Sequence, residues 1–263
     1  MQSSSHPHVS SLHYGWVAWP EHGTLFPEQP FPEFPAETKK AWGSDGLTVI
    51  EHQWAREHVQ IVFAATAQLS PVEIARLAKG RLQHALRQVN WPAKFSRKVA
   101  IRAIGRNTRE TVESYVKHQL DRADLADPRY RDSLAKHAIA DPRVRLDEPA
   151  ETERGRYWYN LHVVLVTSDR YRMGGAPVLE TIREACRSAA ATGGYGLAKL
   201  AVMPDHLHLA VRGNPQHAPV QVIEAFRDAM AKQLRMTCFW KEGGYVGTFG
   251  EYGLDALHGN RRE

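Results

Sequence analysis

The chain repeats itself, and this repeat limits the folds that it can adopt. EHVQIVFAATAQLSPVEIARLAKGRLQHALR (57–87) aligns without a gap to DHLHLAVRGNPQHAPVQVIEAFRDAMAKQLR (205–235), at an offset of 148 residues. Identical residues coincide at several positions, among them His58 on His206, Pro71 on Pro219 and Leu86 on Leu234. Each copy is typical of an alternating strand, a short loop with a proline near the helix start, and an amphipathic helix. The repeat therefore predicts two copies of one α+β unit.

The two copies are expected to be joined by a polar linker. After a contraction of three residues, VAIRAIGRNTRE (99–110) still matches YVGTFGEYGLD (245–255). We expect the first unit to span residues 1–120 and the second to span residues 156–263. The stretch between them, 121–155, is polar and contains prolines, which is the composition of a linker with room for one short helix.

The composition is that of a globular protein and restricts the partners only weakly. The chain of 263 residues has 34 Lys and Arg against 29 Asp and Glu, and its net charge of +5 is compatible with a polyanion without being diagnostic of one. Cys186 and Cys238 form no CxxC pattern, so neither a zinc ribbon nor a disulfide framework is indicated. We find no apolar run long enough to span a bilayer and no signal-peptide pattern. We therefore expect no membrane contact and a cytoplasmic location.

Two histidines in MPDHLHLAVRG (203–213) are candidate metal ligands. The alternation of HLHLAV indicates a strand on which His206 and His208 face one side while apolar residues face the other. Two imidazoles at positions i and i+2 of a strand can converge on one ion. Because the chain has 14 histidines, such a pair also arises by chance, and a strand with two half-exposed histidines is the alternative.

A helix that carries a tyrosine is predicted at the end of the first copy. NTRETVESYVKHQL (107–120) has Asn107 as its N-cap and Glu110 three residues later, as in a capping box. Tyr115 and Gln119 lie at positions i and i+4 on one face of this helix, beside an apolar stripe. The alternative is a tyrosine at the edge of the core with its hydroxyl in water, and a glutamine that is only one more polar residue on the helix.

The two copies differ at these positions in a complementary way. His208 of the second copy corresponds to Gln60 of the first, and Tyr115 of the first copy corresponds to Asn260 of the second. The sequence ends before any equivalent of Gln119. One copy thus has the two histidines, and the other has the Tyr-x-x-x-Gln helix.

Together these motifs resemble one protein family. PDHLHLAV (204–211), followed by a helix and then by YVGTFGE (245–251), resembles the single-tyrosine HUH transposases of small insertion sequences that move as single-stranded DNA. REP-associated tyrosine transposases are relatives of that family. IGRNTRETVESYVKHQ (104–119) in the first copy resembles the later part of the same pattern. The two copies together cover most of the chain.

The resemblance implies a fold, a dimer and an active site. The family fold is a ferredoxin-like α+β fold, in which helices back an antiparallel sheet. In the family dimer, two histidines and a glutamine hold Mg²⁺ or Mn²⁺, and the tyrosine helix of one subunit reaches the histidines of the other. Carried over to this chain, the metal ligands are His206, His208 and Gln119, and Tyr115 is the nucleophile that attacks a DNA phosphodiester. The chain would then be two ferredoxin-like units fused in tandem, a pseudo-dimer with one complete composite site.

The two motifs that the copies retain, the histidine strand and the tyrosine helix, are the ones that can meet in this arrangement. If each copy had lost its motifs independently, this matching pair would not be expected to remain. The complementary site would pair Gln60 with Asn260 and is expected to be inactive. A phenol is a poor nucleophile at neutral pH unless a metal or base is positioned beside it. A divalent ion polarises the scissile phosphate, and a neutral glutamine oxygen fits Mg²⁺ or Mn²⁺ better than zinc. A 5′-phosphotyrosine intermediate leaves a 3′-hydroxyl that can later reverse the step and join strands.

A basic strip just before the tyrosine helix is the stronger candidate for DNA contact. KFSRKVAIR (94–102) and the residues that follow it supply five candidates, which are Lys94, Arg97, Lys98, Arg102 and Arg106. The amphipathic helix of the first copy is also basic, but charges on such a helix are usually its solvated face.

The sequence leaves three functions open. The first is a metal-dependent single-stranded DNA endonuclease and strand transferase, a transposase with a covalent tyrosine intermediate. The main alternative is a domesticated protein that binds a DNA hairpin or structured RNA without cutting it, and the third is a metal-bound fold without chemistry. Single-stranded or hairpin DNA is the expected partner, and the internal pseudo-dimer predicts a monomer. With one site, the protein must cut two ends in sequence, pair with another copy or perform a partial reaction.

Overall fold

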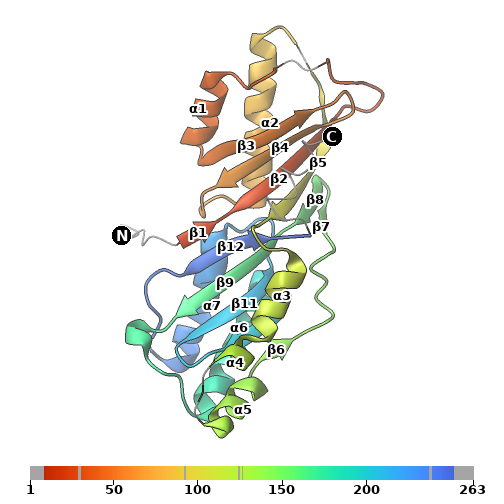
Figure 1. The fold of residues 1–263 in the computed structure, drawn as a ribbon. Helices are drawn as coiled ribbons and strands as arrows, with labels where there is room; N and C mark the ends of the chain where they lie inside the picture. Colours follow the sequence, from red (N-terminus) through yellow and green to blue (C-terminus); the bar gives the residue numbers. More distant parts are fainter. Residues whose placement is uncertain are drawn as a thin grey trace.

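Two six-stranded sheets lie end to end and form the body of the protein (Figure 1). The computed structural model describes residues 9–28, 31–91, 93–123, 125, 127–236 and 239–251. The first sheet consists, in spatial order, of β3 (Leu47–Trp54), β4 (Val59–Ala65), β2 (His13–Pro20), β5 (Phe95–Ile104), β8 (Gly155–Trp158) and β7 (Ala150–Thr152). The second sheet consists of β1 (Val9–Ser11), β12 (Tyr245–Phe249), β9 (Asn160–Val166), β11 (His206–Arg212), β10 (Gly196–Val202) and β6 (Ile139–Ala140).

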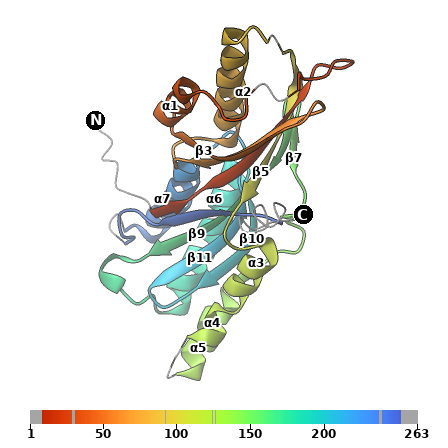
Figure 2. The same cartoon turned by 45° about the horizontal axis from the view of Figure 1, so that its top comes forward.

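Four strands of each sheet have the same order, which is that of a ferredoxin-like βαββαβ unit. The order is β5-β2-β4-β3 in the first sheet and β12-β9-β11-β10 in the second, and neighbouring strands are antiparallel. Helices back the sheets, as Figure 2 shows, and they are α1 (Ala36–Ser44), α2 (Pro71–Gln88), α6 (Ala176–Gly193) and α7 (Pro219–Leu234). The predicted α+β class and the two ferredoxin-like units are thus confirmed. Among the described residues no helix combines the length and apolar character needed to cross a bilayer.

The first strand of each unit begins in the sheet of the other unit. Only Leu12 separates β1 from β2, and β1 runs parallel to β12 in the second sheet. In the same way, only Tyr159 separates β8 from β9, and β8 runs parallel to β5 in the first sheet. Both linking residues are buried, so the chain passes from one sheet to the other through the core. The repeat predicts two units but not this division of a strand between two sheets.

The ends of β5 and β12 pass each other with their backbones in direct contact. A Cβ atom on Gly105 would lie 2.1 Å from the carbonyl oxygen of Thr248, and one on Gly250 would lie 2.2 Å from the carbonyl oxygen of Ala103. The hydroxyl of Thr248 accepts a hydrogen bond from the backbone nitrogen of His13 at 2.8 Å. The two glycines that match in the repeat are therefore required for the same steric reason.

The N-termini of α2 and α7 exchange hydrogen bonds across the junction between the units. The backbone nitrogen of Val72 donates to the carbonyl oxygen of Pro215 at 3.2 Å, and that of Val220 donates to the carbonyl oxygen of Ala67 at 3.0 Å. These two pairs are equivalent under the offset of the repeat. In each unit, a backbone carbonyl oxygen accepts a hydrogen bond from a first-turn amide of the other unit's helix, and this amide has no partner within its own helix. A two-fold dimer interface has the same reciprocity.

The tyrosine helix begins later than predicted and is interrupted. The predicted N-cap is Asn107, but the cap of α3 (Arg109–Lys117) is Thr108, whose hydroxyl accepts a hydrogen bond from the backbone nitrogen of Thr111 at 3.4 Å. The helix stops before position 118, and a short second helix, α4 (Gln119–Arg122), follows. The capping-box prediction was therefore wrong by one residue, because the threonine hydroxyl takes the role assigned to the asparagine.

The polar segment between the units is folded and contributes a strand to each sheet. It contains α5 (Pro128–Lys136) as well as β6, which pairs with β10, and β7, which pairs with β8. The hydroxyl of Tyr130 donates to the carbonyl oxygen of Met173, and Leu134 is fully buried. The apolar face of α5 thus ties residues predicted as a linker to the second unit.

Replacing Gly105 with alanine is expected to lower the free energy of unfolding by about 2 kcal/mol, because the new methyl group forces the β5 and β12 backbones apart. Gly80→Ala in α2 is the control, since a Cβ there meets no atom within 4 Å and should stabilise the helix by about 0.5–1 kcal/mol. Urea unfolding measures both changes. If Gly105→Ala unfolded within a few tenths of a kcal/mol of the unsubstituted protein, the steric account of the crossing would be wrong.

Candidate active site

Strand β11 presents His206 and His208 toward helix α3. Leu207 and Leu209 alternate with the histidines and are fully buried on the opposite face of the strand. His208 is also buried, at 4% exposure, whereas His206 at the start of the strand is half-buried. Ala210, the next residue on the histidine face, belongs to the apolar cluster beneath α3. The strand and the common orientation of the two histidines agree with the sequence pattern.

A carboxylate holds the ring of His206. The Nδ1 atom of His206 lies 2.6 Å from Oδ1 of Asp205, and Arg170 donates to the other carboxylate oxygen at 3.0 Å. Burial acts to raise the pKa of Asp205, but the hydrogen bonds from His206 and Arg170 outweigh it and hold the pKa below its usual value. Because Nδ1 faces the carboxylate, Nε2 is the atom of His206 that can bind a ligand.

His208 lies edge to edge with a third histidine, His162 of β9. The Nε2 atom of His162 lies 3.1 Å from Nδ1 of His208, and the two rings are inclined by 13° with their centroids 5.3 Å apart. The Nε2 atom of His208 is buried and has no hydrogen-bond partner among the described residues. Burial lowers the pKa of His208 to about 3 and that of His162 to about 4. Both rings are therefore neutral at pH 7, the form of imidazole that binds metals.

Tyr115 comes to these histidines from the other half of the chain. Its ring lies edge-on to the rings of His208 and His162, at centroid distances of 5.5 and 5.9 Å. The side chain is 37% exposed, so the phenol can be reached from solvent. The helix rests on the second sheet through a small apolar cluster of Val112, Val116, Leu146, Ala198, Ala201, Ala210 and Phe249. The structure thus places the predicted nucleophile of the first copy beside the histidines of the second.

Gln119 is buried one turn beyond the tyrosine. It is 8% exposed, and its Nε2 atom donates to the carbonyl oxygen of Tyr115 at 3.0 Å. Since the amide nitrogen is engaged in this hydrogen bond, the amide oxygen is the atom that could bind a cation. The interruption between α3 and α4 falls just before this residue, so its placement does not follow from simple i, i+4 spacing on one helix.

The donor atoms of this group suit a divalent cation. Two imidazole nitrogens and an amide oxygen are uncharged donors, and the unpartnered Nε2 of His208 is a buried nitrogen that a bound ion would satisfy. No group of three or more His, Cys, Asp or Glu side chains in the described part of the chain is placed to hold a metal. Gln119 is the predicted third ligand, and the contact given for its side chain is with the carbonyl oxygen of Tyr115, not with either histidine.

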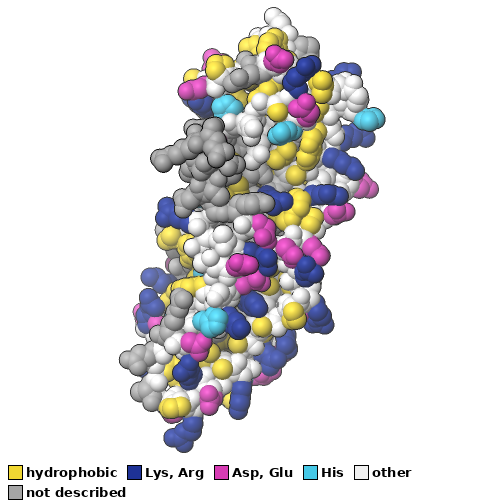
Figure 3. Space-filling model, turned by 45° about the vertical axis from the view of Figure 1, so that its right-hand side comes forward, with side chains coloured by type: hydrophobic (Ala, Val, Ile, Leu, Met, Phe, Trp, Pro, Cys, Tyr) yellow, Lys and Arg dark blue, Asp and Glu magenta, His cyan; other side chains and the backbone are white. Residues whose placement is uncertain are grey.

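Most of the predicted basic strip lies away from the histidines. Lys94 precedes β5 and is 3.8 Å from Glu21, while Arg97 and Lys98 are exposed neighbours on the strand and so face opposite sides of it. At the usual rise per residue, Lys94 and Arg106 are separated by about 40 Å along the strand. Figure 3 shows basic and acidic side chains interspersed over one face of the protein instead of a single basic surface.

Arg106 is the predicted basic residue whose charge acts on the site. Burial raises the pKa of Tyr245, and the charge of Arg106 opposes this effect. The ring of Tyr245 is in turn 5.7 Å from that of His162. Arg102 has a different environment, because its guanidinium group lies over the ring of Trp158, 4.3 Å from the centroid.

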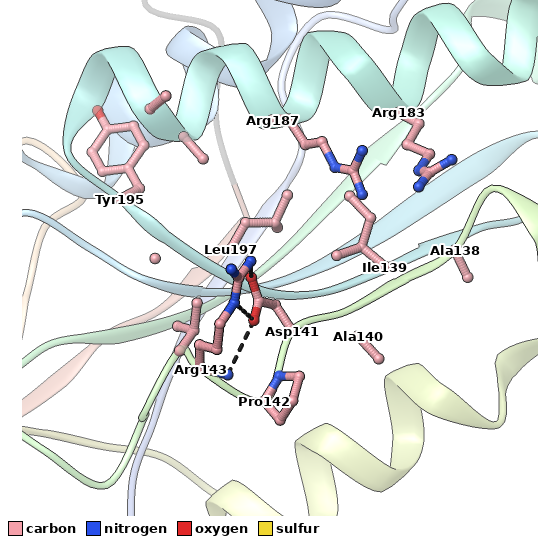
Figure 4. A pocket seen from close by; sticks show the side chains of 14 residues that line it. Ala138, Ile139, Ala140, Asp141, Pro142, Arg143, Arg183, Arg187, Tyr195 and Leu197 are labelled. Atoms are coloured by element: carbon pink, nitrogen blue, oxygen red, sulfur yellow. Dashed lines mark hydrogen bonds and ion pairs between the residues drawn. The ribbon is translucent and has the colours of Figure 1, made fainter.

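A hollow at the β6 edge of the second sheet also contains arginines, but they are neutralised within it. Arg143 folds back onto Asp141 with contacts of 2.8 and 2.9 Å (Figure 4). Arg183 and Arg187 on α6 are each paired with a glutamate three residues earlier, at 3.4 and 2.9 Å. The hollow therefore lacks the uncompensated positive charge of an anion site.

The equivalent position of the first sheet has no histidine pair. Gln60 on β4 occupies the place of His208, and Gly15 on β2 occupies the place of His162, as the matching strand registers show. Asn260, the predicted counterpart of the tyrosine, lies outside the described residues. Of the three histidines of the first position, only His206 has a histidine counterpart among the described residues of the second, which is His58.

The sequence patterns did not identify three residues of the site. Asp205 stands directly before the histidine strand, and its carboxylate could have been recognised as a partner for His206. His162 is a polar residue within the apolar run LHVVLV (161–166), which is a signal of a special role in a central strand. Tyr245 belongs to the motif used for the family resemblance, but its position beside His162 depends on strand pairing.

The second half of the chain matches a family model, and parts of the chain resemble known proteins. Residues 156–257 match the family model described as "Transposase IS200 like". The ISDra2 transposase TnpA of Deinococcus radiodurans is 30% identical over 89 residues, which cover 33% of this chain and 64% of that protein. A crystal structure of a candidate transposase from Deinococcus radiodurans R1 shares 22% identity, covers 43% of this chain and 95% of that one, and superposes with a TM-score of 0.35. The chain thus spans less than two thirds of the TnpA relative, and the superposition is too weak to support an argument.

Replacing Val116 with alanine is expected to loosen α3 from the second sheet, because the valine is 1% exposed in the small cluster under the helix. A loss of about 2 kcal/mol is expected from the missing methyl groups. Hydrogen exchange of the α3 amides measures the local opening. Val89→Ala is the control, since that valine is 43% exposed after α2. Unchanged protection of α3 in Val116→Ala would show that other contacts hold the tyrosine in place.

Proposed function

We propose that this chain, whose residues 156–257 match the model of the IS200-like transposase family, is a metal-dependent single-stranded DNA endonuclease and strand transferase. It forms a 5′-phosphotyrosine intermediate at one composite active site. Tyr115 is the nucleophile, and His206, His208 and Gln119 are the ligands of the metal. The substrate is a single-stranded or hairpin DNA.

The contact between Tyr115 and His208 is the observation that carries the proposal. The two residues are 93 positions apart, on different copies of the repeat, and their rings are 5.5 Å apart. A tyrosine that only filled the edge of the core would have no reason to meet two histidine rings, one of which has a buried nitrogen without a hydrogen-bond partner among the described residues. This juxtaposition favours chemistry over the structural alternatives for both motifs.

The chain supplies a nucleophile and fixed polar groups around it. The phenolic oxygen of Tyr115 attacks the phosphorus of the scissile phosphodiester, and a new O–P bond forms as the bond to the 3′ oxygen breaks. The phenolic proton is lost, and the departing oxygen takes up a proton to become a 3′-hydroxyl. Because one phosphodiester replaces another, the bond energy is retained, and attack by a 3′-hydroxyl on the phosphotyrosine restores a DNA strand.

The proposed ligands suit Mg²⁺ or Mn²⁺. When bound, such an ion polarises the scissile phosphate and offsets the charge that develops in the transition state. His206 and His208 are oriented for this by Asp205 and His162, and burial keeps His208 uncharged. Gln119 begins the helix after that of the nucleophile, and its hydrogen bond to the carbonyl oxygen of Tyr115 ties the proposed ligand to the backbone of the tyrosine.

We propose that one polypeptide contains the whole catalytic unit and is a monomer. The exchange of β1 and β8 between the sheets and the reciprocal bonds of Val72 and Val220 satisfy within one chain the contacts that a dimer would make. One site cannot cut two DNA ends at once. The protein would therefore cut them in sequence or with a second molecule.

Tyr115→Phe is expected to abolish a covalent protein–DNA adduct while leaving DNA binding within about threefold of the starting affinity, because only the attacking oxygen is removed. End-labelled single-stranded hairpins are incubated with Mg²⁺ or Mn²⁺ and resolved on a denaturing protein gel, and binding is followed by anisotropy. His208→Ala should also lose the adduct.

Tyr171→Phe is the control, since this tyrosine is 61% exposed and lies outside the histidine group. An adduct that survives Tyr115→Phe would assign the nucleophile to another residue. Tight hairpin binding without an adduct, with either metal and across varied hairpins, would instead identify a domesticated binding protein.

Arg106→Gln is expected to weaken hairpin binding about three- to tenfold and to reduce its salt dependence, because one fewer counterion is released when a phosphate contact is lost. Lys94→Gln is the control, since that side chain is 82% exposed at the far end of β5. Affinities are measured by anisotropy at several salt concentrations. Equal losses in the two variants would indicate only a general effect of net charge.

A further inference from the structure

The hydrogen bond between His162 and His208 allows two proton arrangements with different consequences. A bond between two imidazole nitrogens, here 3.1 Å apart, requires one to donate and the other to accept. If Nδ1 of His208 donates, its Nε2 atom has a lone pair. If Nε2 of His162 donates, the proton of neutral His208 resides on Nε2 instead, and that atom cannot bind a cation.

The burial of His208 favours the first arrangement. Its Nε2 atom is buried and has no hydrogen-bond partner among the described residues. An unpaired N–H group and an unpaired lone pair both lose their hydration in such a place, at a cost of about 1–3 kcal/mol, but only the lone pair can be satisfied by a cation. A lone pair directed toward a cation site is satisfied as soon as an ion binds. The surroundings therefore select the tautomer in which His208 donates to His162.

The two copies of the repeat support a functional pairing of these histidines. In the first sheet, glycine (Gly15) stands in the place of His162, and glutamine (Gln60) stands in the place of His208. Neither histidine is retained without the other. A histidine needed only to fill space in a central strand would have no reason to be absent together with the candidate ligand.

We propose that His162 is a positioning residue that accepts a hydrogen bond from Nδ1 of His208 and so fixes the tautomer and ring orientation in which Nε2 binds the metal. The proposal rests on the proposed function, because it concerns the same metal site. It assigns to an imidazole the role that Asp205 has for His206, where a carboxylate faces Nδ1 at 2.6 Å. The two ligands would thus be oriented by different partners.

The tautomer of His208 tests the proposal without metal or DNA. In protein labelled with ¹⁵N-histidine, two-bond ¹H–¹⁵N spectra distinguish the protonated ring nitrogen from the other one. We expect His208 to have its proton on Nδ1 in the unsubstituted protein and in His162→Gln, whose side-chain oxygen can still accept. In His162→Phe, which keeps an aromatic ring but no acceptor, the proton should move in part to Nε2. A proton on Nε2 in the unsubstituted protein, or on Nδ1 in all three proteins, would overturn the proposal.

The affinity for Mn²⁺, measured by calorimetry, is the second readout. His162→Phe should weaken it about 10- to 100-fold, and His162→Gln only a few fold. His217→Phe is the control, because that half-buried histidine is bonded to the hydroxyl of Tyr195 at 2.8 Å, away from the site. It should leave both readouts unchanged, whereas equal Mn²⁺ affinity in His162→Phe and the unsubstituted protein would contradict the proposal. If the unsubstituted protein bound no Mn²⁺, the proposed metal function would fail, and the tautomer alone would decide the role of His162.

Discussion

The composite site depends on the close crossing of β5 and β12 at the junction of the two sheets. With no side chain at Gly105 or Gly250, the two backbones touch, and the chain leaving β5 continues along the end of β12. There Thr108 pairs with Gly250, and the backbone nitrogen of Arg109 donates to its carbonyl oxygen at 2.7 Å. Helix α3 therefore starts against the second sheet and not the first. The meeting of tyrosine and histidines follows from where this helix is allowed to begin.

The two sides of the site differ in how firmly they are held. The histidines lie on central strands whose opposite face is fully buried, and this burial also keeps His208 and His162 neutral. The tyrosine lies on a helix of nine residues that rests on a cluster separate from the main core. Elements with few buried apolar contacts open at lower free energy than the core. The histidines are thus the fixed part of the site, and Tyr115 is on the part that can shift.

Local patterns predicted local structure well and long-range pairing poorly. Alternation placed His206 and His208 on one face of a strand, and the repeat predicted two equivalent units, because both signals depend on neighbours in sequence. The sharing of β1 and β8 between sheets leaves no such signal, since an edge strand looks the same whichever sheet it joins. The contact between His162 and His208 leaves no local signal either, because it joins side chains of two neighbouring strands that are far apart in the sequence. The segment predicted as a linker contains the short helix for which its composition left room, but the pairing of β6 and β7 with the two sheets has no local signal.

Fusion also changes which residues a copy must keep. In a homodimer, one sequence has to supply both the histidine strand and the tyrosine helix, so neither can be lost. In a fused chain each copy needs only the motif that it contributes to the composite site. The first sheet can therefore have Gly15 and Gln60 in the places of His162 and His208 without affecting that site. A buried ring nitrogen without a partner is costly unless a ligand satisfies it. Where no tyrosine and no cation are needed, stability favours the loss of both histidines together.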